Sequence, residues 1–251
     1  MTARLTQIVR HPVKSVGFET LTQAALEPGA ALPFDRHWAI AHVAAKFGAA
    51  PTGWVSKMNF LRGWAEPSLM AVSCTFDPAT GALTLHHPKA ATVTVHPGTP
   101  QGDAALIDWV RPLWPDTRPE PAHVVQVPGQ AMTDNAEPFV AILNHASNRA
   151  LGQRMGRDLS IHRWRGNLWL DGLAAWEEFD LIGRDITIGS VRLRVDDRIT
   201  RCRATAANPD TGMLDADTLG ALQDSYGHQD FGVFATVLTG GTVRLGDEVT
   251  L

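Results

Sequence analysis

Apolar and polar residues alternate over many short stretches of the chain, and glycine and proline separate these stretches. Alternation with a period of two is typical of β-strands. The turn sequence DPATG at 77–81 lies between two such stretches and predicts a hairpin, as do the glycines at 189 and 240–241. The expected strands cover residues 5–13, 38–43, 54–56, 69–76, 82–86, 91–95, 123–127, 159–170, 185–188, 191–195, 231–238 and 242–251.

Helical signals are fewer than strand signals. We expect helices over 104–110, where residues 101–103 supply an N-terminal cap, over 147–155, which ends at Gly156, and over 217–226. Many short strands with glycine and proline turns and few helices favour closed or sandwiched β architecture. We therefore expect a mainly β protein, built as a β-barrel, with a few short helices.

A proline-rich segment divides the chain. Residues 111–121 read RPLWPDTRPEP, and so many prolines exclude a helix interior or a central strand. We place a domain boundary here, with an N-terminal domain at 1–118 and a second domain at 119–251.

Composition excludes several classes of protein. With 44% hydrophobic and 19% charged residues among 251, the chain is typical of a globular protein, and its net charge of −4 disfavours nucleic acid as a partner. Two cysteines cannot form a disulfide framework, which suits a reducing compartment. The start of the chain lacks the apolar run of a signal peptide, and no apolar stretch is long enough to cross a membrane. We expect a cytoplasmic protein without a membrane partner.

Cys202 lies between two arginines, in the sequence Arg201-Cys202-Arg203. Cationic neighbours favour the thiolate, which attacks electrophiles or binds soft metals. Two observations oppose this interpretation. A free cysteine is most often a small buried hydrophobe, and in a strand both arginines would point away from the thiol. Cys74 has no cationic neighbour in the sequence, and we expect it to lie in the core.

Two charged turns are candidate anion sites. Lys14 and Ser15 follow a proline and precede Gly17, so an ammonium, a hydroxyl and backbone donors would lie on one turn. A solvated lysine is the alternative. Asp35 and Arg36 form the second turn, for which the alternative is an ordinary surface ion pair.

A third cationic segment lies within 159–170. If it is a strand, Arg163, Arg165 and Asn167 share one face. That face is either an anion site or a row of surface salt bridges, and the residues alone do not decide. The ten histidines show no spacing typical of a zinc site, and no nucleotide-binding glycine loop or GxSxG elbow is present.

Several motifs in order resemble those of the MOSC proteins, which share a domain with the C-terminal part of molybdenum cofactor sulfurase. The resemblance spans nearly the whole chain and fits the branch with an N-terminal MOSC β-barrel half, which includes reductases of N-hydroxylated bases. The motifs are HPVKSVG at 11–17, FDRHW at 34–38, HRWRGN at 162–167, WEE at 176–178, RCRAT at 201–205, NPDTG at 208–212, FGVF at 231–234 and GTVRLGDEV at 241–249.

This resemblance implies a MOSC-type barrel, preceded by the N-terminal half, that binds the molybdopterin form of the molybdenum cofactor. Cys202 matches the cysteine that ligates molybdenum, and Asp134 matches an acidic residue near the metal, for which an Asx-turn is the alternative. A thiolate suits a soft metal, and guanidinium groups suit a phosphate monoester. The residues implied to bind the cofactor are Lys14, Ser15, Arg36, Arg163, Arg165, Asn167, Arg201 and Thr205.

The chain departs from the family pattern at two positions. His11 replaces a tyrosine and Phe34 replaces a glycine, so the pterin pocket is expected to differ in shape. The chain lacks the aminotransferase-like domain of the sulfurase, so pyridoxal phosphate is not expected. Its two cysteines cannot ligate an iron–sulfur cluster, so electrons would come from a separate ferredoxin- or flavin-type protein.

Three hypotheses follow. The first is a molybdenum-dependent oxidoreductase that reduces small N-hydroxylated or N-oxide compounds, in which Cys202 ligates the metal and Asp134 orients or protonates the leaving oxygen. The second is a non-catalytic protein that carries the cofactor or sulfur. The third is a β domain that has lost the cofactor and in which Cys202 is part of the packing.

Overall fold

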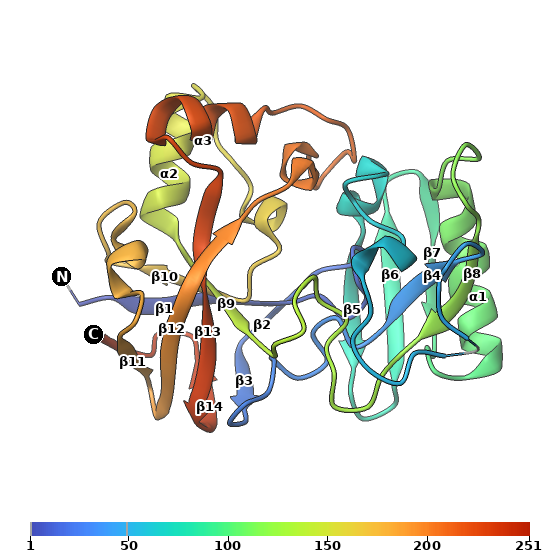
Figure 1. Ribbon diagram of the computed structural model, residues 1–251, viewed down its shortest axis with the longest axis horizontal. Helices are drawn as coiled ribbons and strands as arrows, with labels where there is room; N and C mark the ends of the chain where they lie inside the picture. Colours follow the sequence, from blue (N-terminus) through green and yellow to red (C-terminus); the bar gives the residue numbers. More distant parts are fainter. Residues whose placement is uncertain (1, 49) are drawn as a thin grey trace.

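A computed structural model describes residues 2–48 and 50–251, which form two lobes side by side (Figure 1). Most regular structure is β, as expected, and the α-helices of the described residues are α1 (Pro100–Val110), α2 (His145–Arg154) and α3 (Thr218–Tyr226). Within these residues no helix has the length and apolar character needed to cross a membrane.

The larger lobe is built on an eight-stranded sheet, with the strand order β15-β11-β12-β13-β9-β10-β1-β2. All neighbours are antiparallel except β9 and β10. A separate pair, β3 with β14, contributes Leu26 and Val243 to the same apolar core as the sheet, so strands surround this core on more than one side. The strands are β1 (Arg4–Arg10), β2 (Glu19–Leu21), β3 (Gln23–Leu26), β9 (Val140–Asn144), β10 (Leu168–Asp171), β11 (Asp185–Ile188), β12 (Val191–Thr200), β13 (Asp230–Thr239), β14 (Gly241–Arg244) and β15 (Val249–Thr250).

The smaller lobe contains a three-stranded sheet, a two-stranded sheet and α1. The expected hairpin around 77–81 is present as β5 (Ser73–Asp77) and β6 (Ala82–His87), and β7 (Ala90–Val95) extends it. β4 (Ala39–His42) pairs with β8 (Pro121–Val125). Trp38, Leu85 and Leu106 pack together in the core of this lobe, and α1 begins at the Thr99 side chain, just before the expected cap.

The chain passes between the lobes in both directions. β1 and β2 belong to the larger sheet although they come first in the sequence, whereas β8 follows the proline-rich segment and pairs in the smaller lobe. The boundary at residue 118 stays a prediction. The lobes are therefore not the two halves of the sequence.

Two expected strand arrangements in the larger lobe are wrong. Residues 159–170 begin as a 3-10 helix, η4 (Ile161–Trp164), because the Ser160 side chain accepts a hydrogen bond from the His162 amide. Gly166 then lies so close to Leu143 that no Cβ would fit, and only β10 continues as a strand. The terminal hairpin is also absent, because both edges of β13 are already paired with β12 and β9, so β14 pairs with β3 and β15 with β11.

A buried ion pair joins the lobes. Arg10 of β1 and Glu19 of β2 are both less than a tenth exposed, with 2.8 Å between Arg10 Nε and Glu19 Oε1. Arg10 Nη2 donates to the Phe76 carbonyl of β5, and the Phe76 amide donates to Glu19 Oε2. The guanidinium also lies over the Phe76 ring, 5.2 Å from its centre. One ion pair of the larger lobe thus satisfies the backbone carbonyl and amide of Phe76 in the smaller lobe.

Replacing Glu19 with glutamine should lower the free energy of unfolding by roughly 3–5 kcal/mol, because it leaves the Arg10 charge buried without a counter-ion. Urea unfolding followed by tryptophan fluorescence measures the change. Glu27→Gln, at an exposed position outside any ion pair of the described residues, is the control. Equal midpoints for the two variants would contradict the role given to this pair.

Candidate functional site

The turn after β1 buries a lysine at the junction of the lobes. The Lys14 amide donates to the Trp38 carbonyl, 2.8 Å away, and Ser15 takes a positive φ of 62°. Lys14 is 5% exposed, and its Nζ donates to the Met132 carbonyl at 2.9 Å and to Asp134 Oδ1 at 2.6 Å. Burial lowers the pKa of Lys14, and the Asp134 carboxylate partly offsets this. Lys14 is thus not the solvated loop lysine of the alternative.

Arg36 lies on the second turn, supported by a buried network. Its amide donates to the His11 carbonyl, and its guanidinium forms an ion pair with Asp35 and donates to the Arg165 carbonyl. The Asp35 carboxylate also accepts from the His11 amide at 2.8 Å and contacts His11 Nδ1 at 3.1 Å. Burial would raise the pKa of Asp35, but Arg36 and His11 hold it far below its ordinary value. The pair is buried and is not an ordinary surface salt bridge.

Three cations lie close enough to Arg36 for its charge to lower their pKa values. Burial, together with Arg36, lowers the pKa of Arg165 to about 9. Burial also lowers the pKa of Arg201 to about 9, with Cys202 raising it and Arg36 lowering it further. Arg36 likewise depresses the pKa of Lys14. We call Lys14, Arg36, Arg165 and Arg201 the cation cluster.

The backbone of this cluster is strained. Only five non-glycine residues in the described chain have a positive φ, and three of them are Ser15, Arg36 and Arg165, at 62°, 48° and 48°. Such conformations cost of order 1–3 kcal/mol each and persist where the surroundings impose them, often at functional sites. Three separate segments predicted to bind the cofactor share this feature, which supports a functional role for the cluster.

Cys202 lies just beyond the end of β12 and is exposed, whereas Cys74 is buried as expected. The chain leaves the strand at Thr200 and Cys202 precedes η6 (Arg203–Ala206), so the expectation based on strand parity does not apply. Arg201 turns inward and donates to the carbonyls of Trp164 and Phe231, each at 2.8 Å.

Thr205 and Arg203 differ in their positions around the thiol. Thr205 is buried, and its amide and hydroxyl both donate to the Cys202 carbonyl, at 3.1 and 3.0 Å. Its hydroxyl also contacts that of Thr218 at 2.6 Å. Thr205 thus fixes the peptide of Cys202, while Arg203 is exposed.

Arg163 and Asn167 do not join the cation cluster. Arg163 donates to the Ala207 carbonyl at 2.8 Å and to Asp215 Oδ1 at 2.7 Å, which fixes the segment after Cys202. The Asn167 side chain accepts from the Ala141 amide and donates to the Val9 carbonyl, so it joins β9 to β1. Arg163 and Arg165 therefore share no strand face, so the strand on which both alternatives for this segment depended is absent. A role for Arg163 or Asn167 in cofactor binding stays a prediction.

Asp134 bridges two lysines. Its Oδ1 accepts from Lys14, and its Oδ2 lies 2.9 Å from Lys57 Nζ. Burial would raise the pKa of Asp134, but the two ammonium groups lower it, so the carboxylate is ionised at neutral pH.

Lys57 was not among the sequence candidates. The expected strand over 54–56 is absent. Instead, a 3-10 helix, η1 (Lys57–Asn59), begins at the Ser56 side chain. The signal that marks Lys57 is its long-range ion pair, which no local pattern reveals.

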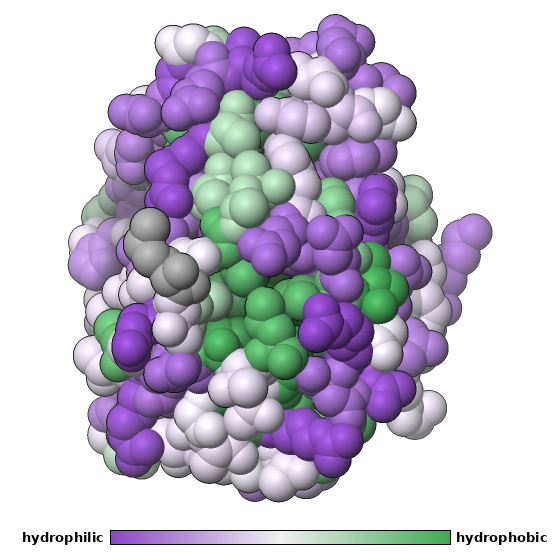
Figure 2. Space-filling model, turned by 90° about the vertical axis from the view of Figure 1, so that its left-hand side faces the viewer, coloured by the Kyte–Doolittle hydropathy of each residue, from purple (hydrophilic) through white to green (hydrophobic). Residues whose placement is uncertain are grey.

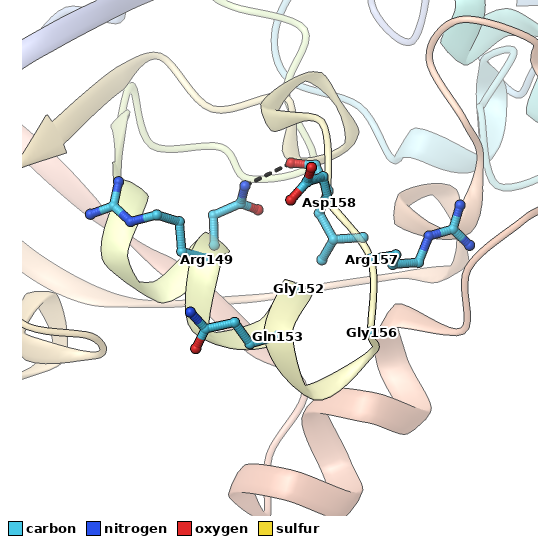
Figure 3. A pocket seen from close by; sticks show the side chains of 8 residues that line it. Arg149, Gly152, Gln153, Gly156, Arg157 and Asp158 are labelled. Atoms are coloured by element: carbon cyan, nitrogen blue, oxygen red, sulfur yellow. Dashed lines mark hydrogen bonds between the residues drawn. The ribbon is translucent and has the colours of Figure 1, made fainter.

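Two hollows in the surface are lined by residues outside the cation cluster. The larger, about 660 Å³, opens between α2 and the following loop, where the Arg149 and Arg157 side chains point in opposite directions (Figure 3). Each of these arginines has a carboxylate partner, Asp171 and Asp215 respectively. A second hollow, about 270 Å³, is lined by Phe18, Cys74 and His162, among others. Neither contains a residue of the cation cluster.

Together, the fold and the site define a β-rich protein with partly buried cations beside an exposed cysteine. In the described residues, no group of three or more His, Cys, Asp or Glu side chains is placed to bind a metal ion. The family model of the MOSC domain matches residues 130–250, and that of the MOSC N-terminal beta barrel domain matches residues 2–109. The chain belongs to the MOSC proteins that carry this N-terminal domain.

Two relatives and one solved structure are similar to the chain. Mitochondrial amidoxime-reducing component 1 of Mus musculus is 30% identical over 140 residues, which is 51% of this chain and 40% of the relative. Mitochondrial amidoxime reducing component 2 of Bos taurus is 30% identical over 124 residues, 44% of this chain and 36% of the relative. This chain thus spans less than half the length of these relatives. The YUAD protein from Bacillus subtilis has a TM-score of 0.47 and 11% identity, covering 99% of this chain and 94% of that one.

The two thiols should differ sharply in reactivity. Burial raises the pKa of Cys74 far above its ordinary value, whereas Cys202 is exposed. Because the thiolate is the reactive form, a thiol reagent such as DTNB should modify only Cys202 in the folded protein and both cysteines after unfolding. Cys202→Ser should abolish the reaction of the folded protein. Modification of Cys74 at a similar rate would contradict the structure.

His11 should make stability depend on pH. Burial, Arg36 and Arg165 lower its pKa well below the ordinary value, so the folded protein keeps it neutral. Below about pH 6.5 the unfolded chain binds the extra proton, and the free energy of unfolding falls as pH falls, by at most about 1.4 kcal/mol per pH unit for this residue. His11→Gln should therefore show a shallower dependence between pH 5 and 6.5 in urea unfolding. Parallel curves for the two proteins would be evidence against a buried neutral histidine.

Proposed function

We propose that the protein is a molybdenum-cofactor-dependent oxidoreductase that reduces small N-hydroxylated or N-oxide compounds. The observation that supports this most is the exposed Cys202 directly after Arg201, a member of a partly buried cation cluster. Molybdopterin carries a phosphate monoester, which guanidinium forks and an ammonium suit, and a thiolate is a soft ligand for the metal. The residues present thus fit this cofactor.

The proposed roles follow from the donors that each residue presents. Arg201 and Arg165 are fixed by backbone carbonyls, so their charges are oriented before any ligand arrives. Arg36 is fixed by its ion pair with the Asp35 carboxylate. Pre-oriented cations bind an anion without losing much side-chain freedom. In this proposal the cluster binds the phosphate end of the cofactor, Ser15 adds a hydroxyl, and Cys202 ligates the metal.

When bound, the molybdenum cofactor would supply the two-electron chemistry. Asp134 is ionised while it contacts both lysines, so in this arrangement it accepts hydrogen bonds and can orient a polar substrate. It would donate a proton to a leaving oxygen only after release from the lysines raises its pKa. The orienting role is therefore the one that the observed contacts favour.

The relatives support the reductase class, since both are named as amidoxime-reducing components. Because the match covers under half of each relative, the substrate class and electron donor are proposals for this chain. We propose a separate donor of the ferredoxin or flavin type, since two distant cysteines, one of them buried, cannot ligate an iron–sulfur cluster. We also propose a cytoplasmic location, because both cysteines are free, which suits a reducing compartment.

A second candidate function is a carrier of the cofactor or of sulfur. The exposure of Cys202 favours it, because a surface thiol is accessible to another protein. The two functions differ in turnover. A reductase should reduce hydroxylamines or amidoximes with an artificial electron donor, whereas a carrier should bind molybdenum without turnover.

Cys202→Ala should lose bound molybdenum, and with it reductase activity, when the protein is made in a host that synthesises the cofactor. Elemental analysis and pterin fluorescence measure the two parts of the cofactor separately. Cys74→Ala is the matched control, because Cys74 is buried in the core of the smaller lobe and should leave the metal content unchanged. Equal molybdenum in both variants would refute the assignment of the ligand. No molybdenum in the wild-type protein would refute the proposed function.

A further inference from the structure

Three segments distant in the sequence meet in the Lys14–Asp134–Lys57 bridge. Lys14 lies on the turn after β1, Lys57 on η1, and Asp134 in the segment between β8 and β9. The Lys14 side chain is 6% exposed, whereas those of Asp134 and Lys57 are 50% and 45% exposed. The bridge therefore has a buried end and a solvated end.

At its buried end, the bridge uses one of the hydrogen-bond donors of Lys14, a member of the cation cluster. An ammonium has three donors, and Lys14 gives one to the Met132 carbonyl and one to the Asp134 carboxylate. The carboxylate thus neutralises a buried ammonium at the cluster, as an anionic ligand would. A buried charge without a partner is costly, so Lys14 requires one anion or the other.

The loop that carries Asp134 is fixed independently of its side chain. The Met132 amide donates to the Arg36 carbonyl at 2.7 Å, and the Met132 carbonyl accepts from Lys14. Trp54 Nε1 donates to the Thr133 carbonyl at 3.3 Å. These backbone contacts do not involve the carboxylate. Asp134 can therefore leave Lys14 by side-chain rotation while the loop stays in place.

The solvated end provides a partner for the released carboxylate. Lys57 Nζ already contacts Asp134 Oδ2, and exposed ion pairs of this kind contribute little to stability and exchange readily. Asp134 would thus keep a counter-ion after Lys14 has changed partner. No buried charge would be left alone at any stage.

We propose that Asp134 is an exchangeable counter-ion of Lys14, displaced by the phosphate of an anionic ligand and then retained by Lys57. This proposal rests on the proposed function, in that the cation cluster is taken to bind a phosphate group. A phosphate dianion can replace the carboxylate because it brings more charge and more acceptor oxygens. A ligand with a single carboxylate gains nothing over Asp134, so the exchange selects for phosphate.

Calorimetric titration of inorganic phosphate into the full chain, made in a host that lacks the cofactor, tests this exchange. Asp134→Asn should bind phosphate roughly tenfold more tightly than the wild type, because the competing charge is gone. Lys57→Met should bind it several-fold more weakly, because Asp134 has lost its second partner and stays on Lys14. Glu137→Gln, which removes an exposed charge from the same loop, is the control and should change little.

The double variant decides how Lys57 acts. If Lys57 acts through Asp134, Lys57→Met should have no effect on phosphate affinity in the Asp134→Asn background. An undiminished effect there would show that Lys57 contacts the anion directly and would overturn the proposal. Equal or weaker binding by Asp134→Asn, and by Asp134→Ser as a second variant, would overturn it as well.

The same titrations separate this proposal from the one on which it rests. If phosphate binds the wild type and its affinity is insensitive to Asp134, the exchange is refuted and the anion site remains. If phosphate binds neither the wild type nor any variant, the anion site is refuted together with the exchange. Urea unfolding of each variant confirms that the folded state is retained.

Discussion

The burial of like charges around Arg36 is the constraint on which the site depends. Each added cation raises the free energy of the others, and burial removes the solvent that would screen them. The protein compensates with the Asp35 carboxylate, with backbone carbonyls aimed at the guanidinium groups, and with Asp134 at the edge. Segments from widely separated parts of the chain supply these groups, so the junction of the lobes is also the place where their charges are balanced.

His11 shows how one departure from the family pattern fits this balance. The family resemblance leads to the expectation of a tyrosine here, and the structure places a neutral imidazole against Asp35. A neutral ring adds no further positive charge beside Arg36 and Arg165, yet it still contacts the carboxylate that orients Arg36. His11 thus supports the carboxylate that orients Arg36 without adding a charge to the cluster.

Local sequence predicted much of the fold but less of the site. The hairpin at 77–81, the helix after Asp217 and the burial of Cys74 follow from turn chemistry, capping and composition, which act over a few residues. The relation of Arg163 to Arg165 was missed because a serine cap and the close approach of Gly166 to another strand determine it. Lys57 was missed because its partner lies in a distant segment. Family resemblance, and not periodicity, brought together the residues of the cation cluster.

The crossing of the chain between the lobes has a consequence for synthesis. β10 is made some 160 residues after its neighbour β1. On the face near the chain ends, apolar residues gather in a central patch surrounded by hydrophilic ones (Figure 2). Pairings over such separations form slowly, because a long loop must close before any contact compensates for its lost entropy. The edge of β1 that pairs with β10 therefore stays unpaired until β10 has been made.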